Sequence, residues 1–182
     1  MDTAHRVQRL SRILRILFTI VLITIPVIQI LFWMFFNRLP EEIVTRSLPI
    51  MVPIAALQDL PLSSRLLALG VNFISTAVVM ACVYYLIRLF MLYEKEQIFT
   101  AENVGCLRVL GRLLIVLFFA DIVESSLLSV ALTLHNPPGQ RMITFGLSSD
   151  EMTTLLFGIV VVLIAWVMDE GRKLQEEQQL TV

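Results

Sequence analysis

Long apolar stretches alternate with short polar ones along the whole chain. They are Ile16–Phe36, Leu66–Ile87, Leu113–Leu134 and Met152–Met168. A helix of roughly 20 residues, rising 1.5 Å per residue, crosses the hydrocarbon core of a bilayer. The pattern therefore predicts an all-α protein, a four-helix transmembrane bundle of two hairpins. Its spans are expected at about 13–36, 66–90, 109–134 and 150–170.

Composition favours lipid as the solvent of this chain. Of the 182 residues, 57% are hydrophobic and only 16% are charged, against roughly 25% charged in an ordinary soluble domain. Mean hydropathy is +0.82. The net charge of −1 gives no support for direct binding to nucleic acid. We expect one integral membrane domain, 1–182, with the lipid bilayer as its first partner.

The distribution of basic residues predicts how the chain is oriented. Ten of the 14 Lys and Arg residues lie before the first span, around the segment between the second and third spans, or after the fourth span. Basic residues accumulate in the cytoplasmic loops of membrane proteins. Both termini, the cytoplasmic elbow 92–111 and the tail 171–182 are therefore expected on the cytoplasmic side.

The elbow 92–111 is polar, charged and too short to form a domain. Thr100 is expected to cap the following helix, because its hydroxyl can accept a hydrogen bond from the backbone amide of Asn103. Phe99 can then pack against Val104 in a hydrophobic staple. A short amphipathic helix is expected to lead from this cap into the third span.

Two other helix starts carry local signals. Ser63 or Ser64 can cap the second span, since a serine oxygen accepts from the free amides of a first turn. Asp150 and Glu151 are expected in the first turn of the fourth span, where the helix dipole favours negative charge.

Four prolines interrupt the segment 37–65, which also carries charges and contains no stretch long enough to span a membrane. We favour an outside loop that lies on the bundle or at the lipid interface. A lid over a cavity is the alternative interpretation.

Polar residues also occur inside the predicted spans. Thr24 and Gln29 in the first span are expected to face other helices rather than lipid. The second span has a polar side, formed by Asn72, Ser75 and Thr76. In the same span, Ala77 and Ala81 form a small-x-x-x-small step that predicts close helix packing.

The third span contains two acids, Asp121 and Glu124. About fourteen Leu, Ile, Val and Phe residues at −0.3 to −0.6 kcal/mol each favour insertion, and two central acids oppose it by about 2.5 to 3.5 kcal/mol each. Asp121, Glu124 and Ser125 share one face, which is expected to point into the bundle. We expect at least one of the acids to be neutral at pH 7, because burial disfavours the charged form.

Three short motifs point to a known family. They are Leu92-Tyr93-Glu94-Lys95, Ile98-Phe99-Thr100-x-x-Asn103 and the closing Leu180-Thr181-Val182. With these motifs, the chain from about Leu62 to its end resembles a bacterial membrane family known as domain of unknown function 2975 (DUF2975). One departure is Glu96, where the family pattern Tyr-Glu-x-Gly would have glycine.

The resemblance implies four helices in a bacterial inner membrane and supplies no catalytic residues. Family members are often encoded beside small helix-turn-helix regulators, which implies, by association, a cytoplasmic regulator as partner.

Three functions remain open at this point. The first is a non-enzymatic regulatory or sequestering partner for a cytoplasmic protein. Its predicted partner-binding residues are Glu94, Lys95, Phe99, Thr100, Asn103, Arg108, Arg172, Lys173, Glu176, Glu177 and Leu180. The second is a small transporter or proton-coupled protein. Its predicted intramembrane polar residues are Asp121, Glu124, Ser125, Gln29 and Thr76. The third is a structural subunit of a membrane complex.

An enzyme is not expected. The sequence contains no metal-ligand cluster, nucleophile elbow or phosphate loop, so we predict no catalytic residues, no metal and no cofactor. The sequence leaves open whether the chain forms a homo-oligomer.

Overall fold

The computed structural model describes residues 2–48, 57, 59–97, 99–137, 139, 141–144 and 149–180, with side chains omitted at 2–4, 46 and 178–180. Its described residues form helices and connections, without a strand. The elements are α1 (Asp2–Met34), a 3-10 helix η1 (Phe36–Arg38), α2 (Glu41–Ser47), α3 (Leu62–Glu94), α4 (Ala101–Thr133) and α5 (Ser149–Leu180). The predicted all-α class is confirmed.

Four of these helices are long and apolar enough to cross a membrane, as predicted. They are α1, α3, α4 and α5, each of 32 or 33 residues. At 1.5 Å per residue such a helix is about 50 Å long, so it extends beyond a hydrocarbon core of about 30 Å. The helical ends therefore reach the headgroup region and water.

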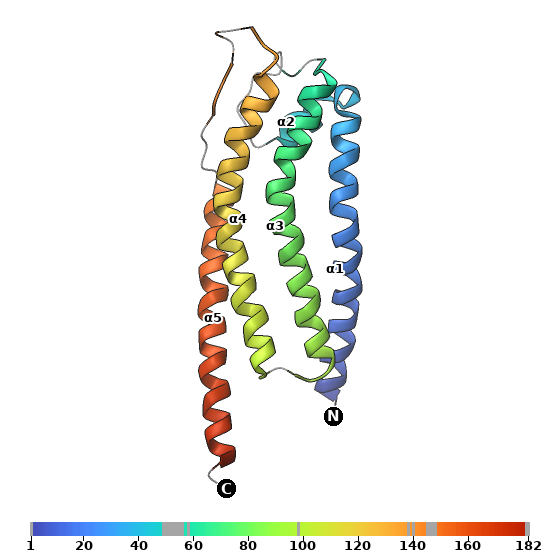
Figure 1. Cartoon of the computed structure of the whole chain (residues 1–182). Helices are drawn as coiled ribbons and strands as arrows, with labels where there is room; N and C mark the ends of the chain where they lie inside the picture. Colours follow the sequence, from blue (N-terminus) through green and yellow to red (C-terminus); the bar gives the residue numbers. More distant parts are fainter. Residues whose placement is uncertain are drawn as a thin grey trace.

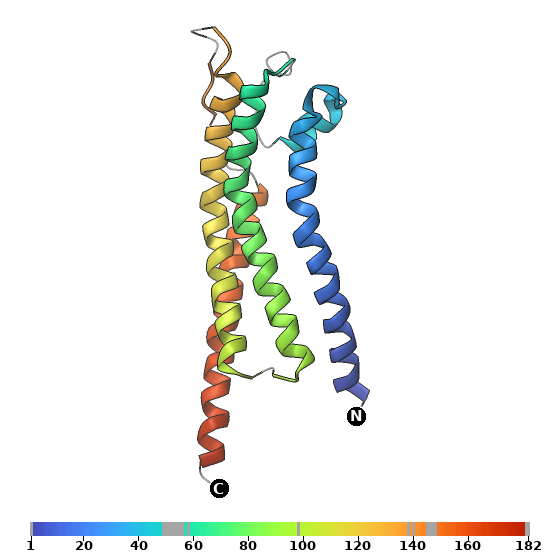
Figure 2. The ribbon, with the colours of Figure 1, turned by 45° about the vertical axis from the view of Figure 1, so that its right-hand side comes forward.

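The long helices lie side by side in chain order (Figure 1). α1 packs on α3, α3 packs on α4 and α4 packs on α5, so α1 and α5 form the two outer members. Both chain termini and the connection 95–100 lie at one end, which we call the terminal end (Figures 1 and 2). The opposite end, which we call the loop end, holds α2 and the segment after α4.

Packing at the loop end is built around aromatic side chains. Trp33 and Phe36 are each only 2% exposed, and their rings stack with centroids 5.0 Å apart. Val44 of α2 and Leu48 after it join the same buried cluster, which reaches Leu128 of α4. Burying such apolar side chains stabilises the fold by about 1.5–3 kcal/mol each. Thus α2 and Leu48 fold back onto the long helices.

This arrangement bears on the two interpretations of the segment 37–65. Residues 41–48 lie on the helices, as an outside loop would, and Ser47 and Leu48 also line a cavity between α1, α3 and α4. Residues 49–56 and 58 lie outside the described residues. The described part of the segment therefore combines features of both interpretations.

α4 and α5 approach each other closely at two glycines. A Cβ atom added to Gly111 would lie 2.6 Å from Val162 Cγ2 and 2.8 Å from the Val162 backbone nitrogen. A Cβ atom added to Gly158 would lie 3.1 Å from the backbone nitrogen of Ile115. The absence of side chains therefore permits close approach of the two backbones. The prediction that Ala77 marks close packing is wrong, because Ala77 is exposed.

Local capping signals had mixed outcomes. Thr100 caps α4 as predicted, with its hydroxyl oxygen 3.3 Å from the Asn103 amide nitrogen. Asp150 and Glu151 occupy the first turn of α5, also as predicted. The expected Ser63 or Ser64 cap is wrong: α3 begins directly after Pro61 and has no side-chain cap. Proline is well suited to this start because its fixed φ places the chain for the first turn.

α3 ends in a Schellman motif whose left-handed residue is Glu96. The Gln97 amide donates to the Leu92 carbonyl at 3.0 Å, and the Glu96 amide donates to the Tyr93 carbonyl at 3.1 Å. Glu96 has a φ of +60°. This backbone conformation favours glycine, the residue that was expected at this position from the family resemblance.

Replacing Glu96 with glycine is expected to raise the free energy of unfolding by about 0.5–1 kcal/mol, because a left-handed residue with a Cβ is strained. The substitution also removes an exposed hydrogen bond from Gln8 Nε2 at 2.9 Å, a small loss at this surface position. Thermal unfolding in detergent measures the change. Lys95→Gly is the matched control: with its φ of −89°, it should lower stability. Equal shifts in the two variants would contradict the strain argument.

Candidate functional site

A chain of hydrogen bonds joins three helices in the loop-end half of the protein. Trp33 of α1 donates from Nε1 to Asn72 Oδ1 of α3 at 2.6 Å. Asn72 in turn donates from Nδ2 to Glu124 Oε1 of α4. The backbone amide of Ser75 lies 3.3 Å from Glu124 Oε2 and donates to it. The Glu124 side chain, in a residue that is 9% exposed, is therefore held by two neutral donors.

The same carboxyl group forms part of the wall of a cavity of about 430 Å³. The cavity lies between α1, α3 and α4 and is bounded on one side by Ser47 and Leu48. Its polar lining residues are Gln29, Ser47, Asn72, Ser75, Thr76 and Glu124. Its apolar lining residues are Ile25, Ile28, Phe32, Leu48 and Val79. Sites for small molecules commonly have this composition, with apolar walls and a few convergent polar groups.

The structure brings together some of the predicted intramembrane residues and separates others. Gln29, Thr76 and Glu124 line one cavity, although they come from three helices. Ser125 is buried, but its hydroxyl donates to the Ile122 carbonyl of its own helix at 3.0 Å, so it does not join the Glu124 network. Asp121 is half-buried on the same side of α4 and lies near Ser75.

The first span contributes one of its two predicted polar residues. Gln29 is half-buried at the cavity. The prediction for Thr24 is wrong: Thr24 is exposed, and its hydroxyl donates to the Ile20 carbonyl of its own helix at 2.7 Å. A threonine in a membrane helix can satisfy its hydroxyl in this way without a neighbouring helix.

Sequence reasoning missed Trp33 as a member of the network. It lies at the end of the first apolar stretch, where an aromatic residue is most simply interpreted as an interface anchor. Asn72 was recognised as polar, and its spacing to Ser75 and Thr76 placed all three on one face of a helix. Nothing in the sequence near these residues indicated that this face of α3 contacts Glu124 of α4.

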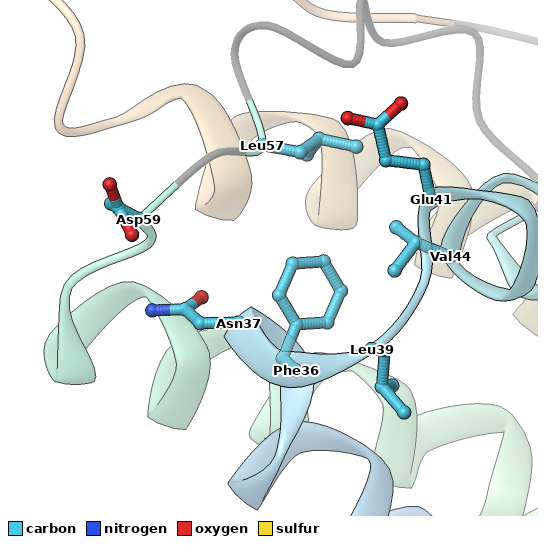
Figure 3. A pocket seen from close by; sticks show the side chains of 7 residues that line it. All are labelled: Phe36, Asn37, Leu39, Glu41, Val44, Leu57 and Asp59. Carbon is cyan, nitrogen blue, oxygen red and sulfur yellow. The ribbon is translucent and has the colours of Figure 1, made fainter.

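A second cavity, of about 250 Å³, lies at the loop end beside α2. In Figure 3 the Phe36 ring points between Val44 and Leu57, and the carboxyl groups of Glu41 and Asp59 lie on separate sides of the opening. Phe36 and Val44 also belong to the buried cluster at this end. The cavity thus borders the packing of α2 and is separate from the Glu124 network.

The terminal end carries an ion pair between α4 and α5 and several ion pairs within α5. Arg108 Nη2 lies 3.2 Å from Asp169 Oδ2, and Arg172 Nη2 lies 3.1 Å from Asp169 Oδ1. Arg172 also pairs with Glu176 at 2.6 Å, and Lys173 pairs with Glu170 at 3.3 Å. Of these pairs, Arg108–Asp169 joins α4 to α5, and the others lie within α5.

A second set of contacts ties α1 to the connection 95–100. Arg15 Nε lies 3.1 Å from Glu94 Oε1. Gln8 Nε2 donates to Glu96 Oε1 at 2.9 Å. The predicted partner-binding residues Glu94, Arg108 and Arg172 therefore already interact within the chain.

The other predicted partner-binding residues differ in accessibility. Asn103 is fully buried and donates from Nδ2 to the Gln97 carbonyl at 3.2 Å, so the prediction that it contacts a partner is wrong. Thr100 uses its hydroxyl as the α4 cap. Lys95 and Glu177 are exposed. The side chain of Leu180 lies outside the described residues.

Phe99, in the connection 95–100, is a large apolar side chain that is 57% exposed. The predicted staple with Val104 leaves more than half of Phe99 uncovered, whereas Val104 is buried at 2% exposure. The C-terminal turns of α5 project past this connection (Figure 1). The exposed Phe99 and the projecting turns of α5 thus both lie at the terminal end.

These features define a polytopic α-helical membrane protein whose central helices enclose a buried acid beside a cavity. The chain belongs to the family described as protein of unknown function (DUF2975), whose model matches residues 50–182. The resemblance described from the sequence began at about Leu62. The family match begins at residue 50, so it also includes the connection that leads into α3. No curated protein and no solved structure matches the chain.

Proposed function

We propose that this membrane protein is a non-enzymatic regulatory or sequestering partner for a cytoplasmic protein, such as a small helix-turn-helix regulator. In this proposal the protein lies in a bacterial inner membrane, with its terminal end in the cytoplasm. The terminal end holds most of the basic residues of the chain, which supports this orientation. The partner binds to the terminal-end surface, formed by Lys95, Phe99, Lys173 and Leu174.

The exposure of Phe99 is the observation that carries the proposal. Burying a phenylalanine side chain contributes about 1.5–3 kcal/mol of stabilisation. Phe99 remains 57% exposed, so a partner that covers it could gain much of this free energy. Aromatic residues ringed by polar groups are frequent anchors of protein interfaces. Leu174, at 54% exposure on the projecting part of α5, adds a second apolar contact.

The ion pairs of the terminal end support a rigid surface. Arg108 and Asp169 hold α5 against α4, and Arg15 holds α1 beside Glu94. Because these charges pair within the chain, we assign them the role of positioning Phe99 and the end of α5. Preorganised contact residues lose less conformational entropy when a partner binds.

A photo-crosslinking residue at position 99 is expected to capture the same cytoplasmic protein reproducibly from intact membranes. The matched control is the same residue at Ile143, which is 65% exposed but lies in the segment after α4, at the loop end. Mass spectrometry of the purified adducts identifies the partner, and removing 174–182 should weaken its capture. An identical set of captured proteins at positions 99 and 143 would contradict this function.

A second candidate function, a small transporter or proton-coupled protein using Asp121 and Glu124, is favoured by the cavity. Glu124 lines a space of about 430 Å³ between α1, α3 and α4, and Asp121 lies on the same side of α4. Ionisable groups inside a membrane are costly and are commonly functional. This function requires solute uptake into vesicles that depends on the two carboxyl groups.

A further inference from the structure

We propose that the 430 Å³ cavity binds a protonated amine with a small apolar body, with its ammonium group beside Glu124. The inference is independent of the cytoplasmic partner. It requires binding alone, and it would supply a solute class for the second candidate function. We refer to this cavity as the amine site, and its lining residues come from α1, α3, α4 and the segment 47–48.

The charge on the ligand follows from the partners of Glu124. Its two hydrogen-bond donors, Asn72 Nδ2 and the Ser75 amide, are both neutral. No Lys or Arg is among the described residues that line the cavity. A buried carboxylate is strongly stabilised when a cation pairs with it, because the surrounding dielectric constant is low. A ligand cation would provide the pairing that the chain does not provide there.

The hydrogen-bonding groups favour an ammonium that carries N–H donors. The Ser75 hydroxyl oxygen is buried; its one hydrogen can be donated to only one of the two nearby acids, and its lone pairs remain free to accept. It lies near both Glu124 and Asp121. Ser75 as a whole is 8% exposed and lines the cavity. A primary ammonium has three N–H donors, which could serve Glu124 and the Ser75 oxygen together.

The apolar lining of the cavity indicates what the uncharged part of the ligand should be. Ile25, Ile28 and Val79 provide apolar walls, and Phe32 adds an aromatic ring. An aromatic ring also attracts a nearby cation through its π-electrons. The volume lies within the range of roughly 300–1,000 Å³ that is usual for small-molecule sites. It suits a single ring or a short alkyl chain attached to the amine.

Two sources could supply this chemistry. One is a soluble amine, and the other is a lipid with a primary ammonium in its headgroup. In both cases the ammonium would occupy the same position beside Glu124. The lipid composition of the test membrane can separate the two sources.

The test uses the full chain reconstituted in nanodiscs of phosphatidylcholine, a lipid whose headgroup has no primary amine. Binding of radiolabelled 2-phenylethylamine is measured at equilibrium, and 2-phenylethanol is the uncharged competitor. We expect saturable binding that Glu124→Gln weakens about ten-fold or more, because the charge-assisted hydrogen bond is lost. Phenylethanol should compete poorly. Asp150→Asn, which removes an exposed acid in the first turn of α5, is the control and should bind as the original chain does.

A second variant tests the proposal independently, in case Glu124→Gln does not fold. Val79→Phe leaves the carboxyl group and its donors in place and fills part of the cavity. It should reduce amine binding while thermal unfolding stays cooperative. Adding phosphatidylethanolamine to the nanodiscs should reduce the apparent affinity if the natural ligand is a lipid, and should leave it unchanged if the ligand is a soluble amine. No saturable binding, or equal binding by Glu124→Gln and the original chain, would overturn the amine site.

Discussion

Replacing Gly111 with alanine is expected to lower the free energy of unfolding by about 1–3 kcal/mol, the range typical of overpacking in a dense interior. The added Cβ would lie 2.6 Å from Val162 Cγ2 and 2.8 Å from the Val162 backbone nitrogen. The side-chain atom can rotate away, but the backbone nitrogen cannot. The contact is therefore relieved only if α4 and α5 separate.

The matched control is Gly105→Ala, also in α4, where an added Cβ would have no atom within 4 Å. This variant should be neutral or more stable, because alanine has the higher helix propensity by about 1 kcal/mol. Thermal unfolding in detergent compares the two. Adding Val162→Ala to Gly111→Ala should recover only part of the loss. An equal response of Gly111→Ala and Gly105→Ala would show that α4 and α5 do not approach as described.

Asn72→Ala is the second substitution for which we expect a large effect. It removes the acceptor of the Trp33 Nε1–H donor and one donor to Glu124. Each buried polar group left without a partner costs about 1–3 kcal/mol, so we expect a total loss of about 2–5 kcal/mol in the free energy of unfolding. Because Trp33 is 2% exposed, water cannot easily replace the missing bond.

A double-mutant cycle separates this network from general packing losses. Trp33→Phe removes the indole donor and retains an aromatic ring in the loop-end cluster. Because Trp33 and Asn72 share a hydrogen bond, the sum of the stability losses of the two single variants should exceed the stability loss of the double variant. The expected difference is about 0.5–3 kcal/mol. Strictly additive losses would contradict the bond. Tryptophan fluorescence provides a second measurement, since Asn72→Ala should change the environment of Trp33.

Features that depend on neighbouring residues could be predicted from the sequence. The four membrane-crossing helices follow from the hydropathy of windows of about 20 residues, which is a local property. The Thr100 cap is also local, since it joins residues three positions apart. The left-handed conformation of Glu96 was not predicted, although the resemblance had marked this position as a departure from glycine.

Predictions about helix faces were less accurate, because periodicity does not identify the neighbour of a face. Thr24 and Ala77 were expected to contact other helices and are exposed. Asn103 was expected at a surface and is buried. Gly111 and Gly158 were overlooked because they lie in different helices, and no local pattern shows that the two helices meet there.

The sequence by itself determined that the chain is an all-helical membrane protein with two acids inside its third span. The tertiary structure decided that Glu124 meets Asn72, 52 positions away, and that Asn72 meets Trp33, 39 positions away. It also decided that α4 and α5 approach each other closely at Gly111 and Gly158. The physical reason is that hydropathy fixes where each helix crosses the bilayer, whereas helix rotation and order depend on packing between side chains that are distant in sequence.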